Sequence, residues 1–172
     1  MVQDFDLLVL ASCIAKGYAF TEPSFVEDFE GGVPPTNWSI NTTGPGGSWF
    51  AASNSLFGDL LGTGEAAMID SDAAGFSQTA STLTTPVIAV ADVSSSIIEF
   101  DSWFRTFGGS DVYNLEVSAD GGAWVAVQAI PANNQADRIS VDIGENLVGA
   151  TSFRLRWNYV ATFEYYALID NI

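Results

Sequence analysis

Carboxylates close to both ends of the 172-residue chain are the residues best suited to chemistry. Asp28 and Glu30 lie in the segment 25–30, and Asp170 lies in the segment 166–172. Both segments are rich in aromatic and branched apolar residues, which predicts β-strands. An unpaired carboxylate in a buried strand is costly, and a hard cation such as Ca²⁺ offsets that cost by taking oxygen ligands.

We therefore predict a structural Ca²⁺ site formed by Asp28, Glu30 and Asp170. Residues two apart on a strand face the same side, so Asp28 and Glu30 should point together. If the terminal strands are neighbours, Asp170 joins them, and carbonyls and water complete the roughly six to eight oxygen ligands of Ca²⁺. Glu27 is an alternative ligand, and Asp70 and Asp72 are candidates for a loop ligand. The competing interpretation is that these acids are solvated and discourage edge-to-edge pairing.

A second group of residues predicts a polar sheet face that suits a sugar. If Ile98, Phe100 and Phe104 are core, Trp103 and Arg105 alternate outward on the same strand. Asn114, Arg154 and Arg156 fall outward on two later strands. If these strands share a sheet, Trp103 offers a stacking plane among hydrogen-bonding groups, the combination that binds a glycan. The competing interpretation is a solvent face of ordinary Arg–carboxylate pairs.

Composition excludes several classes of function. The chain has 21 Asp and Glu against 5 Lys and Arg, a net charge of -16, so we expect no nucleic-acid partner and no attraction to anionic membranes. It has no His, which removes Ser-His-Asp catalysis and the usual zinc sites. A jelly-roll glycosidase would need flanking carboxylates; Glu99 and Asp101 are the tempting pair, but the third carboxylate of such clusters is missing. We predict that the protein is not an enzyme.

The elements that must position these residues are short strands separated by turns. Segments such as 97–100, 113–117, 124–127 and 139–143 are rich in strand-forming residues, and Gly, Asn and Asp clusters separate them. The clearest is 152–160, in which Phe153, Leu155, Trp157 and Tyr159 share one face. This pattern predicts an all-β fold, an antiparallel β-sandwich of the jelly-roll (galactose-binding-like) type, over residues 24–172.

Residues 1–23 differ from the rest and predict a leader or N-terminal segment. The longest apolar run is far short of the roughly 20 residues that span a bilayer, so no transmembrane segment is expected. Leu10-Ala-Ser-Cys13 is similar to a bacterial lipobox, which would make Cys13 a lipid anchor. The acidic, Lys- and Arg-free stretch before it is unlike an export signal, and a plain segment packing on the domain is the alternative. As the one cysteine, Cys13 allows no internal disulfide.

An ordered series of motifs after residue 24 resembles the extracellular jelly rolls that include MAM domains, cleaved adhesin modules and choice-of-anchor J modules. The matching pieces are Asp28-Phe-Glu-Gly-Gly, Pro34-Pro-Thr-Asn-Trp38, Trp49, Leu83-Thr-Thr-Pro86, Phe100, Asp111 to Ser118, Gly121-Gly-Ala-Trp124, Val141-Asp142, Phe153 to Trp157 and Ile169-Asp-Asn-Ile172. The paired cysteines of eukaryotic MAM domains are missing, so the bacterial adhesin-like branch is nearer. Such domains usually run slightly beyond this point, which suggests truncation of a longer, multidomain chain.

The resemblance implies a secreted or cell-surface module with a structural Ca²⁺ where its terminal strands meet. It also implies a non-catalytic role in cell adhesion or carbohydrate binding, with a glycan or a cell-surface protein as partner. The alternative from another class is a structural spacer in a larger surface protein, and a jelly-roll glycoside hydrolase is the third.

Overall fold

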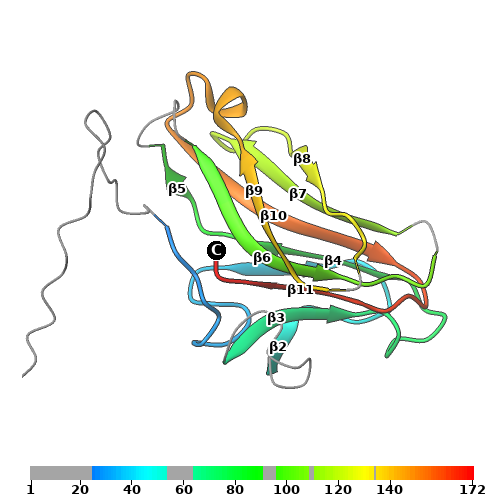
Figure 1. The fold of residues 1–172 in the computed structure, drawn as a ribbon. Helices are drawn as coiled ribbons and strands as arrows, with labels where there is room; N and C mark the ends of the chain where they lie inside the picture. The colour runs from blue at the N-terminus through cyan, green and yellow to red at the C-terminus, as the bar shows by residue number, and fades with distance from the viewer. Residues whose placement is uncertain (1–24, 54–63, 91–95, 109–110, 134) are drawn as a thin grey trace, which may run out of the picture.

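Two antiparallel sheets pack face to face in the computed structural model, which describes residues 25–53, 64–90, 96–108, 111–133 and 135–172 (Figure 1). The first sheet has the order β1 (Ser39–Thr42), β4 (Thr79–Thr84), β10 (Ser152–Ala161), β7 (Val112–Ala119) and β8 (Val125–Ala129), and β5 (Ile88–Ala89) also pairs with β10. The second has the order β2 (Phe50–Ser53), β3 (Glu65–Asp70), β11 (Tyr166–Asp170), β6 (Ile97–Phe104) and β9 (Asp137–Asp142). A short 3-10 helix, η3 (Gly144–Leu147), follows β9. The predicted all-β sandwich is confirmed.

Strand β10 shows why this sequence forms a sandwich. Its burial alternates at every residue, and Phe153, Leu155, Trp157 and Tyr159 face the core as predicted. The intervening side chains, Arg154 among them, remain partly exposed on the outer face. A strand with one apolar face must cover that face, and a second sheet supplies the cover.

Aromatic rings fill the space between the sheets around Trp157. The ring of Trp38 stacks on Trp157 at 6.1 Å between centroids, and Phe100 of β6 meets it edge-on at 5.5 Å. Phe29 packs in turn against Trp38 at 5.7 Å. Because Trp157 belongs to the first sheet and Phe100 to the second, this cluster joins the two layers across the core.

The segment 25–30 is not the regular strand that the sequence predicts. Apart from one backbone pair between Glu27 and Ile172, its residues form no ladder, and Phe29 adopts a φ of 57°, in the left-handed region, where the chain turns. The aromatic Phe29 is fully buried, so core packing holds the segment in place. The predictions for residues 1–23, including Cys13, lie outside the described residues. Within the part of the chain that the structure describes, no helix is long and apolar enough to cross a membrane.

The carboxyl groups of Asp111, directly before β7, and Glu164, between β10 and β11, lie close together. The pKa of Asp111 is raised to about 6, chiefly by burial and further by the charge of Glu164 and a hydrogen bond to it. A hydrogen bond between two carboxyl groups requires that one of them hold a proton. Glu164 is buried, and its Oε2 also accepts a hydrogen bond from the amide of Phe107.

We expect this pair to make folding stability depend on pH. The folded pKa of Asp111 lies above its ordinary 3.8, so the folded state keeps a proton that the unfolded state releases between about pH 4 and 6. Stability therefore falls as pH rises through that window, and Asp111→Asn should raise the free energy of unfolding above pH 6 by about 1 kcal/mol after allowance for solvent screening. Urea unfolding at pH 4 and 7.5, with the exposed Asp72→Asn as control, measures this. Equal pH slopes for wild type and Asp111→Asn would contradict it.

Candidate functional site

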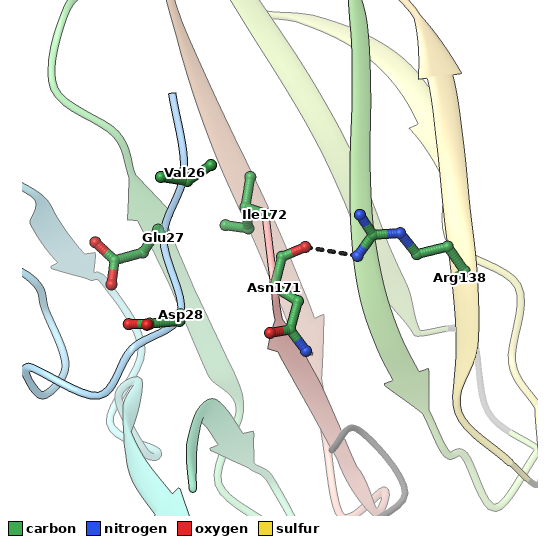
Figure 2. A pocket seen from close by; sticks show the side chains of 6 residues that line it. All are labelled: Val26, Glu27, Asp28, Arg138, Asn171 and Ile172. Atoms are coloured by element: carbon green, nitrogen blue, oxygen red, sulfur yellow. Dashed lines mark hydrogen bonds between the residues drawn. The ribbon is translucent and has the colours of Figure 1, made fainter. Parts of the chain in front are cut away.

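The two ends of the described chain lie side by side, as predicted. The amide of Glu27 donates to the carbonyl of Ile172 at 3.1 Å, and the amide of Ile172 donates back to Glu27 at 2.9 Å. This exchange is the pattern of an antiparallel pair. An open pocket of about 430 Å³ lies at the junction, lined by Val26, Glu27, Asp28, Arg138, Asn171 and Ile172 (Figure 2).

The three carboxylates predicted to bind Ca²⁺ separate in the structure. Asp28 lines the pocket, and its Oδ1 accepts from the amide of Glu30 at 3.2 Å. Glu30 instead reaches β3, where its Oε1 accepts from the amide of Glu65 at 3.0 Å. Asp170 is only 2% exposed in β11 and accepts from the amide of Asn171 at 2.8 Å. The turn at Phe29 explains the separation, because Asp28 and Glu30 no longer share one side of a strand.

Among the described residues, no three acidic side chains gather closely enough to hold a metal ion together. The alternative ligand Glu27 does lie with Asp28 in the pocket, and Figure 2 shows both carboxylates on the side away from Arg138. One oxygen of Glu27 accepts from the amide of Phe29 at 2.8 Å. The loop candidate Asp70 accepts from the amide of Ala73 at 3.0 Å and stabilises its own turn.

Arg138 of β9 occupies the other side of the pocket. Its Nη1 donates to the carbonyl of Asn171 at 2.6 Å and to Oδ1 of Asp101 at 3.2 Å, and its Nη2 lies 3.8 Å from Glu99. Asp101 lies directly opposite Asp170 in the β6–β11 pair, where two like charges repel. A cation beside Asp101 relieves that repulsion, so the pair Glu99 and Asp101 serves here as counter-charge for Arg138.

The predicted polar face is divided between the two sheets. Trp103 lies on β6 and Arg105 directly after it, in the second sheet, whereas Asn114 of β7 and Arg154 and Arg156 of β10 belong to the first. The condition on which the predicted face depends, that these strands share a sheet, is therefore not met, although Asn114, Arg154 and Arg156 do lie on one outer face. Alternation along a strand identifies the outward face but carries no information on which strands become neighbours.

Trp103 is covered rather than open to a ligand. It is 7% exposed, its ring packs edge-on against Tyr166 at 5.2 Å, and its Nε1 donates to the carbonyl of Asn133 at 3.1 Å. It belongs to a small apolar cluster on the outer side of the second sheet with Ala52, Ala66, Met68 and Leu168. The guanidinium of Arg105 lies 4.2 Å from the ring centre of Tyr165.

The outer face of the first sheet carries a connected set of polar and aromatic side chains around Trp124, which we call the Trp124 face. The guanidinium carbons of Arg156 and Arg154 lie 4.4 and 5.4 Å from the Trp124 ring centre. Arg156 donates through Nε to Glu116 Oε2 at 2.6 Å, with Nη2 at 2.5 Å from the same oxygen. Asn158 donates to the other Glu116 oxygen at 2.8 Å. Strand pairing places Asn114 opposite Asn158.

A tight turn between β7 and β8 positions Trp124 on this face. Asp120 and Gly121 have φ values of 46° and 72°, the positive values that favour Asp-Gly in such turns, and the amide of Gly122 donates to Ala119 at 2.8 Å. Asp120 also accepts hydrogen bonds from Thr151 and Ser152 at the start of β10, and these bonds lower its pKa. The hairpin is therefore fixed to the strand that bears both arginines.

Trp124 is the functional candidate that sequence reasoning missed. The sequence places it directly after a glycine-rich turn, and in the structure it is partly exposed and does not belong to the core. The arrangement can stack the apolar face of a ring on indole while guanidinium, carboxamide and carboxylate groups exchange hydrogen bonds with hydroxyls.

Comparisons with known proteins support the fold. No protein-family model matches the chain, and no curated protein matches it significantly. The K1 cleaved adhesin domain of Lys-gingipain from Porphyromonas gingivalis W83 superposes with a TM-score of 0.60 at 16% identity, over 86% of this chain and 94% of that one. TmCBM61 in complex with β-1,4-galactotriose superposes with a TM-score of 0.55 at 13% identity, over 84% and 90%.

A further similar structure comes from work on carbohydrate-binding modules of the β-sandwich superfamily, with a TM-score of 0.50 at 11% identity, over 83% of this chain and 58% of that one. Identities this low show the fold alone. The predicted resemblance to adhesin-like jelly rolls is thus confirmed as a resemblance of fold.

The Glu116 network should contribute measurably to stability. Glu116→Ala leaves Arg156 and Asn158 without their shared acceptor in a mostly buried setting, so we expect the free energy of unfolding to fall by about 2 kcal/mol. The matched control is Glu99→Ala, whose carboxylate is 56% exposed and 3.8 Å from Arg138; it should cost less than about 1 kcal/mol. Urea unfolding at pH 7.5 measures both. Similar losses in the two variants would show that the network adds nothing beyond an exposed ion pair.

Proposed function

We propose that the protein is a non-catalytic, extracellular carbohydrate-binding or adhesion module that contacts glycan through the Trp124 face. The observation that carries this proposal is the placement of Arg154 and Arg156 against the Trp124 ring, with Arg156 held by Glu116. Rigid positioning of polar groups around an aromatic plane lowers the entropic cost of binding. The adhesin and carbohydrate-binding neighbours share the fold and so make this function compatible with the scaffold.

The Trp124 face includes three of the five residues predicted from sequence to bind a ligand, namely Asn114, Arg154 and Arg156. Trp103 and Arg105 lie on the second sheet and take no part in this proposal. Glycoside hydrolysis has less support, because Glu99 and Asp101 are engaged by Arg138. The alternative is a structural spacer of a larger surface protein, for which the same face would be a solvent-exposed network without a ligand.

A glycan array separates these alternatives. We expect the wild-type chain to bind a subset of glycans and Trp124→Ala to bind them at least about tenfold more weakly, since loss of a stacking aromatic side chain at a binding hot spot costs about 2 kcal/mol. Phe50→Ala is the control, because Phe50 is an exposed aromatic residue on the second sheet. Silence across the array for a folded wild-type chain would favour the spacer.

We also propose that Ca²⁺ binds at the pocket between the segment 26–28 and the residues Asn171 and Ile172. Support comes from the Glu27 and Asp28 carboxylates that line this pocket and from the paired backbone beside them. Two carboxylates with carbonyl and water ligands fit a weak site of the type found in extracellular modules, which bind Ca²⁺ at about 0.1–1 mM. The ion would hold the N-terminal segment against Asn171 and Ile172.

Thermal unfolding with Ca²⁺ or EDTA tests the metal proposal. Saturation at a hundred times the dissociation constant stabilises the folded state by about 2.7 kcal/mol, so the unfolding midpoint should rise by several degrees. The double variant Glu27→Gln, Asp28→Asn should lose the shift, and the exposed Glu145→Gln should keep it. An unchanged midpoint for wild type at 50 mM Ca²⁺ would mean that these acids are solvated charges.

A further inference from the structure

Three exposed phenylalanines gather at one end of the sandwich, and we call them the Phe tip. Phe76, Phe107 and Phe163 are 84%, 79% and 44% exposed, and they lie on the connections that follow β3, β6 and β10. Figure 1 shows that β3, β6 and β10 all end on the side of the sandwich away from the C-terminus. Single exposed apolar residues are ordinary, but three exposed rings at one end of a domain mark an interaction surface.

Contacts among the loops make the Phe tip one unit. Phe76 stacks on Phe163 with 4.5 Å between ring centres and 24° between planes. The amide of Phe107 donates to the Glu164 carboxylate, and its ring lies 6.2 Å from that of Tyr165. All three loops therefore converge on the segment 163–165, and stacking supports the exposed rings of Phe76 and Phe163.

The backbone at Phe163 directs its ring toward Phe76. Phe163 has a φ of 52°, a left-handed conformation that is strained for a bulky residue. Stacking of the Phe163 ring on Phe76 supports this conformation from within the chain. What the stack does not explain is that both rings stay exposed to solvent at the end of the sandwich.

The size and shape of the tip favour a lipid surface over a second protein. Together the three rings expose roughly the area of two whole phenylalanine side chains, about 400 Å² at ~200 Å² each. That is about half of the ~800 Å² per partner in a standard protein interface. A bilayer has no such minimum, because each protruding ring that enters the interface adds its own buried apolar area.

Residues behind the rings suit the headgroup region. Arg105 stacks on Tyr165, and Tyr165 lies beside Tyr166, so a cation and two amphipathic aromatic residues surround the base of the tip. The exposed Asp72 on the Phe76 loop limits insertion to the ring ends. With a net charge of -16, the chain is repelled by anionic membranes. We infer that the Phe tip inserts shallowly into the surface of an electrically neutral lipid bilayer.

Co-sedimentation with phosphatidylcholine vesicles tests this inference on the full chain. We expect wild type to partition onto the vesicles and the double variant Phe76→Ser, Phe107→Ser to partition at least tenfold less. Each substitution removes an aromatic ring that would otherwise be buried in the lipid. Phe107→Leu should retain most of the binding because it keeps an apolar side chain. Phe50→Ser removes an exposed ring on the second sheet and should bind as wild type does. Addition of phosphatidylserine should reduce binding.

Thermal unfolding of each variant shows that loss of binding is not loss of fold. Failure of the folded wild type to partition, or equal partitioning of the double variant, would overturn the inference. The inference would also be overturned if wild type bound a protein or a glycan but not the vesicles, and if the double variant lost that binding. The Trp124 face is unchanged in all these variants, so glycan binding and vesicle binding can fail separately.

Discussion

The structure depends on the alternation of strand β10. Its inner side chains build the aromatic core. There Trp157 contacts Trp38, which directly precedes β1, and Phe100 of the opposite sheet. Its outer side chains Arg154 and Arg156 form the Trp124 face. One strand thus ties the packing of the sandwich to the geometry of the candidate site. A shift of one residue in its register would place guanidinium groups in the core and tryptophan in water, so the hydrophobic effect specifies the site as strictly as it specifies the fold.

The chain ends show how charge is handled in a protein with many more acids than bases. Asp170 and Asp101 lie opposite each other on the neighbouring strands β11 and β6. Arg138 of β9 lies beside Asp101. The same Arg138 fixes the carbonyl of Asn171, directly before the residue that pairs with Glu27. Closure of the sandwich at its ends therefore combines backbone pairing with electrostatic balance. A cation at Glu27 and Asp28 would extend the same principle to the other side of the pocket.

Sequence patterns predicted the fold class and most strands because local alternation survives in the folded state. The face of 152–160 and the Asp120-Gly-Gly turn follow directly from residue type. Two features could not be predicted in this way. Strands β6 and β10 belong to different sheets, and this depends on contacts far apart in the sequence. Local alternation therefore could not show that Trp103 and Arg154 lie on different faces. The turn at Phe29 results from burial of its ring against Trp38, a tertiary contact that overrides the strand propensity of the segment 25–30.

Strand β7 sets the relation between the two candidate surfaces. It begins next to Asp111, beside the Phe tip, and ends next to Asp120, in the turn that positions Trp124. Eight residues of strand span roughly 25 Å at about 3.3 Å per residue, so one small ligand does not reach both surfaces. If the Phe tip binds lipid and the Trp124 face binds glycan, as proposed, the two surfaces would act together at a cell surface that presents both ligands. Binding through one surface would raise the local concentration of ligand for the other, and two weak contacts joined by a rigid strand would give an avidity that neither has alone.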